Sequence, residues 1–316
     1  MRVVRGYHDL APHDRGASAA LGNFDGLHKG HRRLIGAAQA AHPEAPAAVV
    51  SFEPHPRRHF QPEAPPFRLC RPEERARVLA RLGLARIHEI PFDETLSVMS
   101  AEAFAEDVLH RGLGLVHVVV GADFRFGRAR RGDPGLLERL GKTLGFGVTV
   151  AAMDPGPDGH YSSTAIRRLI TEGDMHAAAL ALGRWHTVSG PVIQGDQRGR
   201  DLGYPTANLA FGEQLKPRHG VYAARVRLHD GPHRGLHDGV ANIGVRPQFG
   251  VNAPNFEVHL FDFKGDLYGT EISVDLVAHL RDEARFDGVE ALIIQMDADS
   301  AAARAILAKS SADGPE

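Results

Sequence analysis

The sequence predicts a two-domain protein, in which a parallel α/β domain precedes a small antiparallel β domain that ends in a helix. In residues 1–184, short β-rich runs alternate with helical segments, which is the order of a parallel sheet built from right-handed crossovers. In residues 185–316, strand-like runs follow one another and are separated by Gly- and Pro-containing turns, which is typical of an antiparallel barrel or sandwich. The length of 316 residues also favours two domains over one.

The elements of the first domain follow from apolar runs and helix signals. The runs predict strands at residues 18–22, 47–52, 87–92, 116–121 and 148–153. Helices are predicted at residues 32–41, 72–83, 101–112, 134–145, 163–174 and 175–183. Pro72 suits the first position of one helix, and Ser100 and Asp133 can cap two others. Gly145 can end the helix that Asp133 begins.

The second domain is predicted from strands without intervening helices. The runs cover residues 185–193, 221–228, 239–244, 256–263 and 270–280. A start that resembles a capping box at Asp287 and Glu290 predicts one helix over residues 289–308. Residues 309–316 are expected to fray, as chain ends commonly do.

The composition restricts the function classes. Lys and Arg number 37 against 39 Asp and Glu, so a net charge of -2 argues against nucleic-acid binding by bulk electrostatics. No apolar run approaches the ~18 residues that a membrane span requires, and the charged first residues do not read as a secretory signal. The single cysteine, Cys70, excludes an intramolecular disulfide and suits a reducing cytoplasm, where we expect the protein to reside.

The loop after the first predicted strand of residues 18–22 reads "GNFDGLHKGH" and leads into a helix. Its glycines allow tight turns and close approach of the backbone to a ligand, and the helix N-terminus that follows favours phosphate. His28 and His31 are therefore candidates for a phosphate site. A metal site is the weaker alternative, because the spacing lacks a Cys or acidic partner, and an incidental Gly-rich turn remains a third.

Three further loops follow strands that should end at the same edge of the sheet. The loops are "FEPHPRRHF" at 52–60, "GADFRFGRARRGD" at 121–133 and "YSSTAIRRL" at 161–169. The last one places hydroxyl groups and an arginine at a helix start, which is a second phosphate cradle. Each loop taken singly is compatible with ordinary capping. Four of them at the carboxyl edge of one parallel sheet, where open α/β sheets bind ligands, indicate a binding site.

The second domain carries a Gly- and Arg-rich loop, "GDQRGRDLGYPTANLAF" at 195–211, and the strand run "FEVHLFDF" at 256–263. Thr206 and Asn208 offer neutral oxygens that suit Mg²⁺, although the loop is equally compatible with a simple polar turn. Glu257, His259 and Phe261 share one face of the strand, opposite the Phe256, Val258 and Leu260 face. The residues alone favour an exposed edge charge for Glu257 over a catalytic base.

Both motif sets, in this order, resemble the bacterial bifunctional riboflavin kinase/FMN adenylyltransferase (FAD synthetase) family. In the first domain the similar segments are "HKGH", "FEPHPR", "GADFRFG" and "SSTAIR". In the second they are "GDQRGRDLGYPTAN", "GVYA", "VANIG", "EVHLFDF", "LYG" and "LRDEARFDG". The departures are local: Val245 and Gln248 replace the usual threonines, Tyr204 the usual Phe, and Gly288 a common Ser.

For residues 1–184 the resemblance implies an FMN adenylyltransferase domain with the Rossmann-like parallel sheet of the nucleotidyltransferases. The residues that would bind ATP are Gly22, Phe24, Asp25, Gly26, His28, Gly30, His31, Ser162, Ser163, Thr164 and Arg167. The residues that would face the flavin are Pro54, His55, Pro56 and Asp123. His28, His31 and Arg167 would be the catalytic groups. Attack by the ionised phosphate of FMN on ATP needs alignment and charge neutralisation but no general base.

For residues 185–316 the resemblance implies a riboflavin kinase domain, built as a Greek-key barrel with a terminal helix. The residues that would bind ATP are Gly195, Arg198, Gly199, Arg200, Thr206 and Asn208. Thr206 and Asn208 would also hold Mg²⁺, and Glu257 would take the proton from the ribityl hydroxyl as it attacks the γ-phosphate.

The function that the resemblance implies is ATP-dependent phosphorylation of riboflavin to FMN, followed by adenylyl transfer from ATP to FMN that gives FAD and pyrophosphate. The expected partners are the small molecules riboflavin, FMN and ATP, with no nucleic acid or membrane. One alternative is a nucleotidyltransferase for another phosphorylated substrate with the barrel as a recognition module. Another is a flavin carrier without catalysis. The sequence does not set the oligomeric state.

Overall fold

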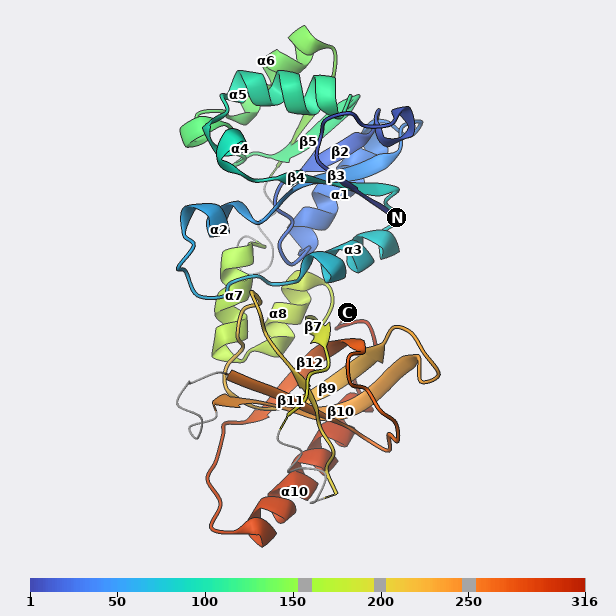
Figure 1. Cartoon of the computed structure of the whole chain (residues 1–316), viewed down its shortest axis with the longest axis vertical. Coiled ribbons are helices and arrows are strands. Elements are labelled where there is room, and N and C mark those ends of the chain that lie inside the picture. The colour runs from blue at the N-terminus through green and yellow to red at the C-terminus, as the bar shows by residue number, and fades with distance from the viewer. Residues whose placement is uncertain (153–160, 196–202, 246–253, 316) are drawn as a thin grey trace. The chain divides into compact units, whose positions relative to one another are not determined.

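The computed structural model describes residues 1–152, 161–195, 203–245 and 254–315 (Figure 1). The chain forms two compact units. The first consists of Met1–Ala64 and Pro72–Ser162, and the second of Pro65–Arg71 and Ser163–Glu316. The predicted assignment of one activity to residues 1–184 and the other to residues 185–316 stays a prediction.

The first unit is built on a parallel sheet with the strand order β1-β4-β3-β2-β5-β6. Its strands are β1 (Arg2–Arg5), β2 (Ser18–Leu21), β3 (Ala47–Glu53), β4 (Arg86–Pro91), β5 (His117–Gly121) and β6 (Gly147–Ala151). The predicted parallel α/β class is confirmed, and five strands fall close to the predicted runs. Strand β1 was missed because it lies at the sheet edge and buries only Val4 of its four residues.

Both faces of this sheet are covered, as the apolar runs predict. Val118 and Val120 belong to one buried cluster and Val119 to another, because successive side chains of a strand point to opposite faces. The helices of the unit are α1 (Lys29–Ala41), α2 (Pro56–Phe60), α3 (Pro72–Arg81), α4 (Glu94–Val98), α5 (Ala101–Ala103) and α6 (Pro134–Leu144). The predicted helix 101–112 has the right extent but continues from α5 as a π-helix over Phe104–Gly112.

The predicted caps of this unit form as the side-chain chemistry requires. The Ser100 hydroxyl accepts a hydrogen bond from the Ala103 N–H at 3.0 Å, and the Asp133 carboxylate accepts one from the Leu136 N–H at 2.7 Å. Gly145 ends α6 with a φ of 88°, a left-handed conformation that glycine adopts without a steric cost.

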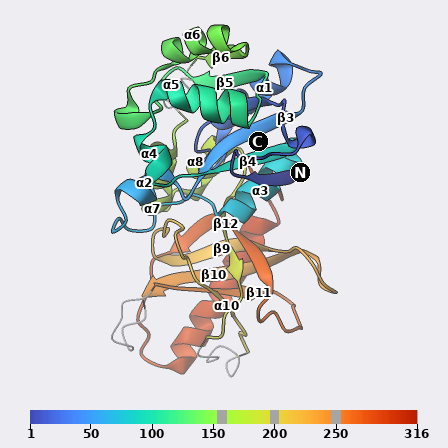
Figure 2. The same cartoon turned by 45° about the horizontal axis from the view of Figure 1, so that its top comes forward.

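The second unit contains a curled antiparallel sheet with the order β7-β12-β9-β10-β11-β8 (Figure 2). Its strands are β7 (His186–Pro191), β8 (Ala207–Leu209), β9 (Gly220–Leu228), β10 (Gly235–Val245), β11 (Pro254–Leu260) and β12 (Glu271–Arg281). The Ile193 N–H donates to the Asn208 carbonyl at 2.8 Å, so the chain beyond β7 meets β8 at the other edge of the sheet. This bridge curls the sheet into the predicted small barrel. Strand β8 was missed because three residues carry too little pattern to be recognised.

The helices of the second unit are α7 (Ser163–Glu172), α8 (Met175–Leu182) and α10 (Val289–Leu307). Ile166 and Ile170 of α7 and Met175 of α8 share one buried cluster with barrel residues such as Phe256. The cluster also includes Leu69 from the segment 65–71. The first two helices therefore complete the core of the barrel, and the packing of this unit begins at residue 163 rather than 185.

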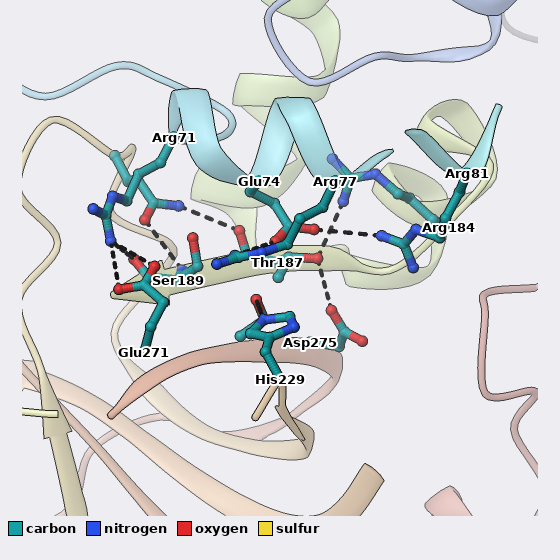
Figure 3. A network of polar contacts seen from close by, with 12 residues as sticks. Arg71, Glu74, Arg77, Arg81, Arg184, Thr187, Ser189, His229, Glu271 and Asp275 are labelled. Carbon is teal, nitrogen blue, oxygen red and sulfur yellow. Dashed lines mark hydrogen bonds and ion pairs between the residues drawn. The ribbon is translucent and has the colours of Figure 1, made fainter. Parts of the chain in front are cut away.

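Polar contacts fasten the segment 65–71 and β7 to β12 within the second unit (Figure 3). The Arg71 guanidinium donates to Glu271 at 3.0 Å and to the Ser189 carbonyl at 3.3 Å. The Thr187 hydroxyl donates to the Asp275 carboxylate at 2.7 Å. The segment 65–71 is therefore bound to the barrel strands, although it lies before α3 in the sequence.

Two expectations for the C-terminal region are wrong. The first residue before α10 is Gly288, which has no side chain, and no side-chain hydrogen bond caps this helix, so the predicted capping box does not form. The terminal residues pack instead of fraying: the Trp185 indole N–H donates to the Ser311 carbonyl at 2.9 Å, and Gly314 is buried. The Arg225 guanidinium also donates to the Leu307 carbonyl at the end of α10 at 2.6 Å and to the Ser310 carbonyl just beyond it at 2.9 Å, which holds this segment in place.

The buried His186 predicts a pH dependence of stability. Its side chain is fully buried, and neither ring nitrogen has a hydrogen-bond partner among the residues described. Burial, assisted by the Arg184 charge, lowers the pKa of His186 from 6.5 to about 3, so the folded protein keeps the ring neutral. The unfolded chain binds a proton below its pKa of about 6.5, and the folded chain does not. Stability from this group is therefore complete above pH 6.5 and falls as the pH decreases from there towards 3.

We expect the free energy of unfolding to decrease by up to about 1.4 kcal/mol per pH unit for this group below pH 6. Urea unfolding of the whole protein at pH 5.0, 6.0 and 7.5 measures the slope, and His186→Leu should reduce it. An equal slope in the parent and the variant contradicts the assignment to His186.

The packing of α7 and α8 predicts how fragments of the chain behave. A fragment of residues 163–316 keeps Ile166, Ile170 and Met175 in the barrel core, whereas a fragment of residues 185–316 exposes their apolar partners. Thermal unfolding should be cooperative for the longer fragment and at least ~10 °C lower, or absent, for the shorter one, because a domain of about 150 residues loses ~2–4 °C per kcal/mol and two packed helices contribute several kcal/mol. Both fragments lack the segment 65–71, so it is not a variable. Equal unfolding temperatures would refute this account of the core.

Candidate active sites

The loop between β2 and α1 is held in an unusual conformation by its own buried side chains. Phe24 and Leu27 adopt left-handed backbone angles with φ of 51°, and Gly26 has a φ of 84°. Such angles are costly for residues with a Cβ and persist only where packing compensates. The Phe24 and Leu27 side chains are fully buried in the same apolar cluster. The conformation of the loop is therefore fixed by the packing of its own side chains.

His28 and His31 form a stacked pair at the start of α1. The His28 ring is the N-cap, with its Nδ1 accepting a hydrogen bond from the His31 N–H at 3.3 Å. The two ring centroids lie 3.6 Å apart, and the Phe24 ring lies 5.1 Å from that of His31. The helix consequently begins at Lys29, three residues before the predicted start.

The helix N-terminus and a ring nitrogen that lacks a partner among the residues described, rather than a positive charge on the rings, make this pair a candidate anion site. Burial, and to a smaller extent the charge of His28, holds the pKa of His31 well below its usual range. An anion beside the ring would favour the protonated form and offset that cost. His31 Nδ1 is buried and has no hydrogen-bond partner in the described part of the chain, and the helix N-terminus adds a positive dipole end. Within the same residues, no three His, Cys, Asp or Glu side chains gather as a metal-binding group.

The absence of a side chain at Gly30 allows this arrangement. A Cβ there would lie 3.2 Å from the His28 ring and 3.4 Å from the Tyr161 carbonyl oxygen. The Lys29 ammonium lies 5.9 Å from the Tyr161 ring centroid. The chain just before Ser162 therefore runs beside the start of α1.

Two other predicted ATP ligands lie in the same loop. At Gly22 a Cβ would make an ordinary contact with the Phe24 ring at 3.4 Å, so space alone does not require glycine there. Asp25 is buried, with 4 % of its surface exposed.

The loop after β3 places His55 at the start of α2. The His55 ring is 8 % exposed, and its Nδ1 accepts a hydrogen bond from the Arg57 N–H at 3.1 Å. Pro54 and Pro56 flank it, and Pro56 opens the short helix. Both prolines remain accessible, Pro54 as an exposed residue and Pro56 as a half-buried one.

An aromatic surface beside this loop was missed by sequence reasoning. Phe60 at the end of α2 is 64 % exposed, and its ring lies 5.7 Å from that of Phe92. The Phe92 ring in turn contacts that of Phe52 at 5.9 Å. Phe60 stands within the quoted "FEPHPRRHF", but nothing in the sequence shows that its ring is exposed. Only the exposed position of the Phe60 ring in the folded structure identifies it as a candidate binding residue.

Asp123 lies at the end of β5, the strand next to β2. The Phe124 N–H donates to the Gly121 carbonyl at 3.0 Å, which closes a turn. The Asp123 carboxylate folds back over Gly121, where a Cβ would meet it at 3.1 Å. The loops of His28 and Asp123 thus leave the carboxyl ends of neighbouring parallel strands, at the point where the strand order reverses.

The remaining predicted ATP ligands of this site divide between the units. Ser162 is the last residue of the first unit, whereas Ser163, Thr164 and Arg167 stand in the first two turns of α7 in the second. The Arg167 Nε donates to the Phe67 carbonyl at 2.8 Å, and the guanidinium lies 5.6 Å from the Phe67 ring. Segment 65–71 therefore orients the arginine within the second unit.

One transverse row of residues crosses the barrel of the second unit. Backbone register pairs Asn208 of β8 with Glu257 of β11, and Glu257 with Asn242 of β10. Asn242 pairs with Val221 of β9, and Val221 with Arg281 of β12. On β11 the predicted alternation is confirmed, because Phe256 and Val258 are fully buried and Glu257 is not. Since β11 lies between β10 and β8, the edge-charge alternative for Glu257 is wrong.

A cavity of about 340 Å³ opens over this row. Its polar lining includes Thr206, Asn242 and Glu257, together with the charged Arg281, Glu283 and Asp299. Its apolar lining includes Phe286, Leu292 and Met296. Sequence reasoning had not assigned Asn242 or these three apolar residues, which come from distant parts of the chain.

A bidentate ion pair holds α10 beside this cavity. The Arg281 guanidinium donates to Asp299 at 2.9 Å through Nε and at 2.7 Å through Nη2. Asp299 is 6 % exposed, and Arg281 also lies 5.6 Å from the Phe286 ring. Arg281 and Asp299 both line the cavity, so the pair joins the end of β12 to the helix that covers it.

Asn208 is packed against Gly195 at the start of the Gly- and Arg-rich loop. A Cβ at residue 195 would lie 2.4 Å from the Asn208 amide nitrogen, so only glycine leaves room for that side chain. Arg198, Gly199 and Arg200 lie outside the described residues, as do Gln248 and the side chain of Val245.

Thr206 also lines a second hollow, of about 70 Å³, with Val192, Leu260, Phe263 and Tyr268 on its apolar side. It therefore stands where two hollows meet.

Tyr204, which replaces the phenylalanine usual in the family, makes a contact that phenylalanine cannot. Its hydroxyl donates a hydrogen bond to the Asp297 carboxylate of α10. That hydrogen bond, with burial, raises the pKa of Tyr204 above its usual value. The ring packs 5.0 Å from that of His259, whose Nδ1 lies 2.9 Å from the Pro205 carbonyl oxygen. The turn before Thr206 is thereby tied to both β11 and α10.

Comparison with known proteins covers both units. The FAD synthetase family model matches residues 10–165, and the riboflavin kinase model matches residues 182–307. The bifunctional riboflavin kinase/FMN adenylyltransferase of Pseudomonas fluorescens is 41% identical, with 98% of this chain and 99% of that protein covered. Its counterpart from Escherichia coli (strain K12) is 38% identical, with 96% and 97% covered. A crystal structure named "Macrolide-efflux Protein from Streptococcus pneumoniae" has a TM-score of 0.84 at 29% identity, covering 96% of this chain and 99% of that one.

A parallel α/β unit that matches the FAD synthetase model and an antiparallel unit that matches the riboflavin kinase model define a transferase with two ATP-dependent activities. The chain belongs to the bifunctional riboflavin kinase/FMN adenylyltransferase family. It phosphorylates riboflavin to FMN with ATP, and it transfers an adenylyl group from ATP to FMN to give FAD and pyrophosphate. The riboflavin kinase match over the barrel leaves no support for a mere recognition module. Of the helices described, none has the length and apolar character needed to span a membrane.

The contact between Gly195 and Asn208 predicts a kinase-specific defect. Gly195→Ala should displace the Asn208 amide and reduce the kcat of riboflavin phosphorylation by about 10-fold or more, as misplaced active-site groups commonly do. FAD formation from supplied FMN should stay within twofold of the parent. Gly190→Ala is the matched control, because its added Cβ would make only ordinary contacts, the nearest at 3.5 Å. Full kinase activity in the Gly195 variant would contradict the expectation that Asn208 contributes to phosphorylation.

Proposed function

We propose that the two activities use separate sites, with riboflavin phosphorylated in the barrel cavity and FMN adenylylated at the carboxyl edge of the parallel sheet. The observation that carries the kinase assignment is the position of Glu257. It stands on an interior strand, in register with Asn208 and Asn242, and faces the cavity that Thr206 also lines. A half-buried carboxylate that faces the cavity beside Thr206 can reach the hydroxyl group of a bound substrate, so its placement supports the part of a base.

In the kinase site, Glu257 would accept the proton of the ribityl 5′-hydroxyl as that oxygen attacks the γ-phosphate. The apolar wall of Phe286, Leu292 and Met296 suits the flat flavin ring, and the hollow of about 70 Å³ beyond Thr206 suits a part of ATP the size of a phosphate group. An acceptor in one hollow and ATP in the other would meet at Thr206, where the phosphoryl group must pass.

Mg²⁺ fits the donors of this site. The Thr206 hydroxyl and the Asn208 amide are neutral oxygen donors on a rigid turn and strand, and Asn208 is held by its contact with Gly195. Bound there with ATP, Mg²⁺ would neutralise charge on the β- and γ-phosphates. The buried thiol of Cys70 and the use of ATP support a cytoplasmic location.

In the adenylyltransferase site, alignment and charge compensation would carry the reaction. The stacked histidines and the α1 N-terminus support binding of ATP phosphates, with Ser162, Ser163, Thr164 and Arg167 added by family resemblance. The His55 loop and the exposed Phe60 ring support binding of the flavin, because an exposed aromatic surface favours stacking with a planar ring. Asp123 would complete the flavin side from the end of β5.

Two substitutions test the separation of the sites in the whole chain. Glu257→Gln should reduce FMN formation at least ~100-fold, because it removes the base, and leave FAD formation from supplied FMN within twofold. His31→Ala should do the reverse, because it removes a group that compensates phosphate charge. Chromatography of the products from riboflavin or FMN with ATP and Mg²⁺ measures both activities. A folded variant in which either change abolishes both activities would overturn the assignment of separate sites.

A further inference from the structure

A buried arginine on α3 connects three segments at the carboxyl edge of the parallel sheet. Arg75 is 2 % exposed, and all its hydrogen bonds described here remain inside the first unit. Its Nη2 donates to Glu89 on β4 at 2.8 Å and to Glu53 at the end of β3 at 3.3 Å. Its Nη1 donates to the Ser51 hydroxyl at 3.0 Å and to the Asn23 carbonyl at 3.5 Å.

The partners of Arg75 lie next to two loops: the one proposed to bind the ATP phosphates and the one proposed to bind the flavin. Asn23 immediately precedes the left-handed Phe24 of the loop that carries the histidine pair, and the Ser51 hydroxyl donates to the same Asn23 carbonyl at 3.1 Å. Glu53 immediately precedes Pro54 of the loop that carries His55. One guanidinium therefore contacts the base of the phosphate-binding loop and the base of the flavin-binding loop at once.

The side chain of Arg75 cannot readily relocate. Val78 and Leu79 bury α3 in the apolar cluster beneath the sheet, so the helix is fixed relative to β3 and β4. Glu89 is 5 % exposed and pairs with two cations: Arg75 at 2.8 Å, which is buried with it, and Arg5 at 3.6 Å, which is 82% exposed, so Arg75 is its buried partner. The planar guanidinium presents several donors in a fixed arrangement, whereas a lysine ammonium acts as a point charge and cannot span the same partners.

We propose that Arg75 is a positioning residue for adenylyl transfer, which sets the spacing between the loop that holds the ATP phosphates and the loop that holds the flavin. The proposal rests on the proposed adenylyltransferase site. In a reaction without a general base, the rate depends on how well the attacking phosphate and the α-phosphorus are aligned. A residue that joins the two loops acts on that alignment and leaves each ligand's own contacts in place.

The test uses full-length protein with Arg75→Lys, which keeps the buried positive charge but not the span. We expect the kcat of FAD formation to fall by about 10- to 100-fold, the range that a displacement of about 1 Å produces. The KM values for ATP and FMN should change by less than threefold. Riboflavin phosphorylation by the same molecules should stay within twofold, which reports that the chain is folded.

Two further variants separate positioning from general stability. Glu53→Gln weakens the link to the flavin loop and keeps the Arg75–Glu89 pair, so it should fold normally and still lower kcat by about fivefold, a partial loss of alignment. Arg81→Gln is the matched control, because Arg81 is on the same helix, is 53% exposed and contacts Glu74 at 3.5 Å, so FAD formation should be unchanged.

The outcomes distinguish this proposal from the site assignment. A kcat within twofold of the parent in both Arg75→Lys and Glu53→Gln overturns the positioning role, as does an equal loss of both activities. If His31→Ala retains FAD formation, the proposed ATP site fails regardless of the Arg75 result. If His31→Ala abolishes it while the Arg75 and Glu53 variants are unaffected, only the positioning role fails.

Discussion

The register of backbone hydrogen bonds across the barrel is the constraint on which the barrel cavity depends. It aligns Asn208, Glu257, Asn242, Val221 and Arg281 in one row over five strands. A slip of one residue in β11 would turn Glu257 into the core and Phe256 into the cavity, because side chains alternate between faces. The apolar core and the polar cavity are thus two consequences of the same pairing. The bridge from Ile193 to Asn208 extends the row to the closing edge.

In the parallel unit the candidate site is held in place by buried side chains instead of by strand register. Its candidate site consists of loops, which carry few backbone hydrogen bonds of their own, so buried side chains must fix them. Phe24 and Leu27 anchor the histidine loop from below, and the Arg75 guanidinium joins its base to β3 and β4. Parallel strands supply the common edge, but the geometry of the loops at that edge depends on these few buried groups.

Sequence reasoning succeeded where the signal is local. Ser100, Asp133 and Gly145 act within one helical turn, and the apolar strands carry their burial pattern in consecutive residues. It failed where a partner is distant. Nothing near residues 309–316 indicates that Trp185 and Arg225 bind this segment, and Gly288 replaces the expected cap of α10. The strands β1 and β8 are too short or too exposed to be recognised alone.

The sequence by itself determined the fold class of each unit and predicted the candidate groups of both sites, because periodicity and short motifs are properties of neighbouring residues. Only the tertiary structure decided that Glu257 stands on an interior strand, that Phe60 is exposed beside His55, and that α7 packs with the barrel. It also decided that the buried Arg75 guanidinium lies between the loop of His28 and the loop of His55. These outcomes depend on contacts between residues far apart in the chain, and such contacts form only when the whole core is assembled.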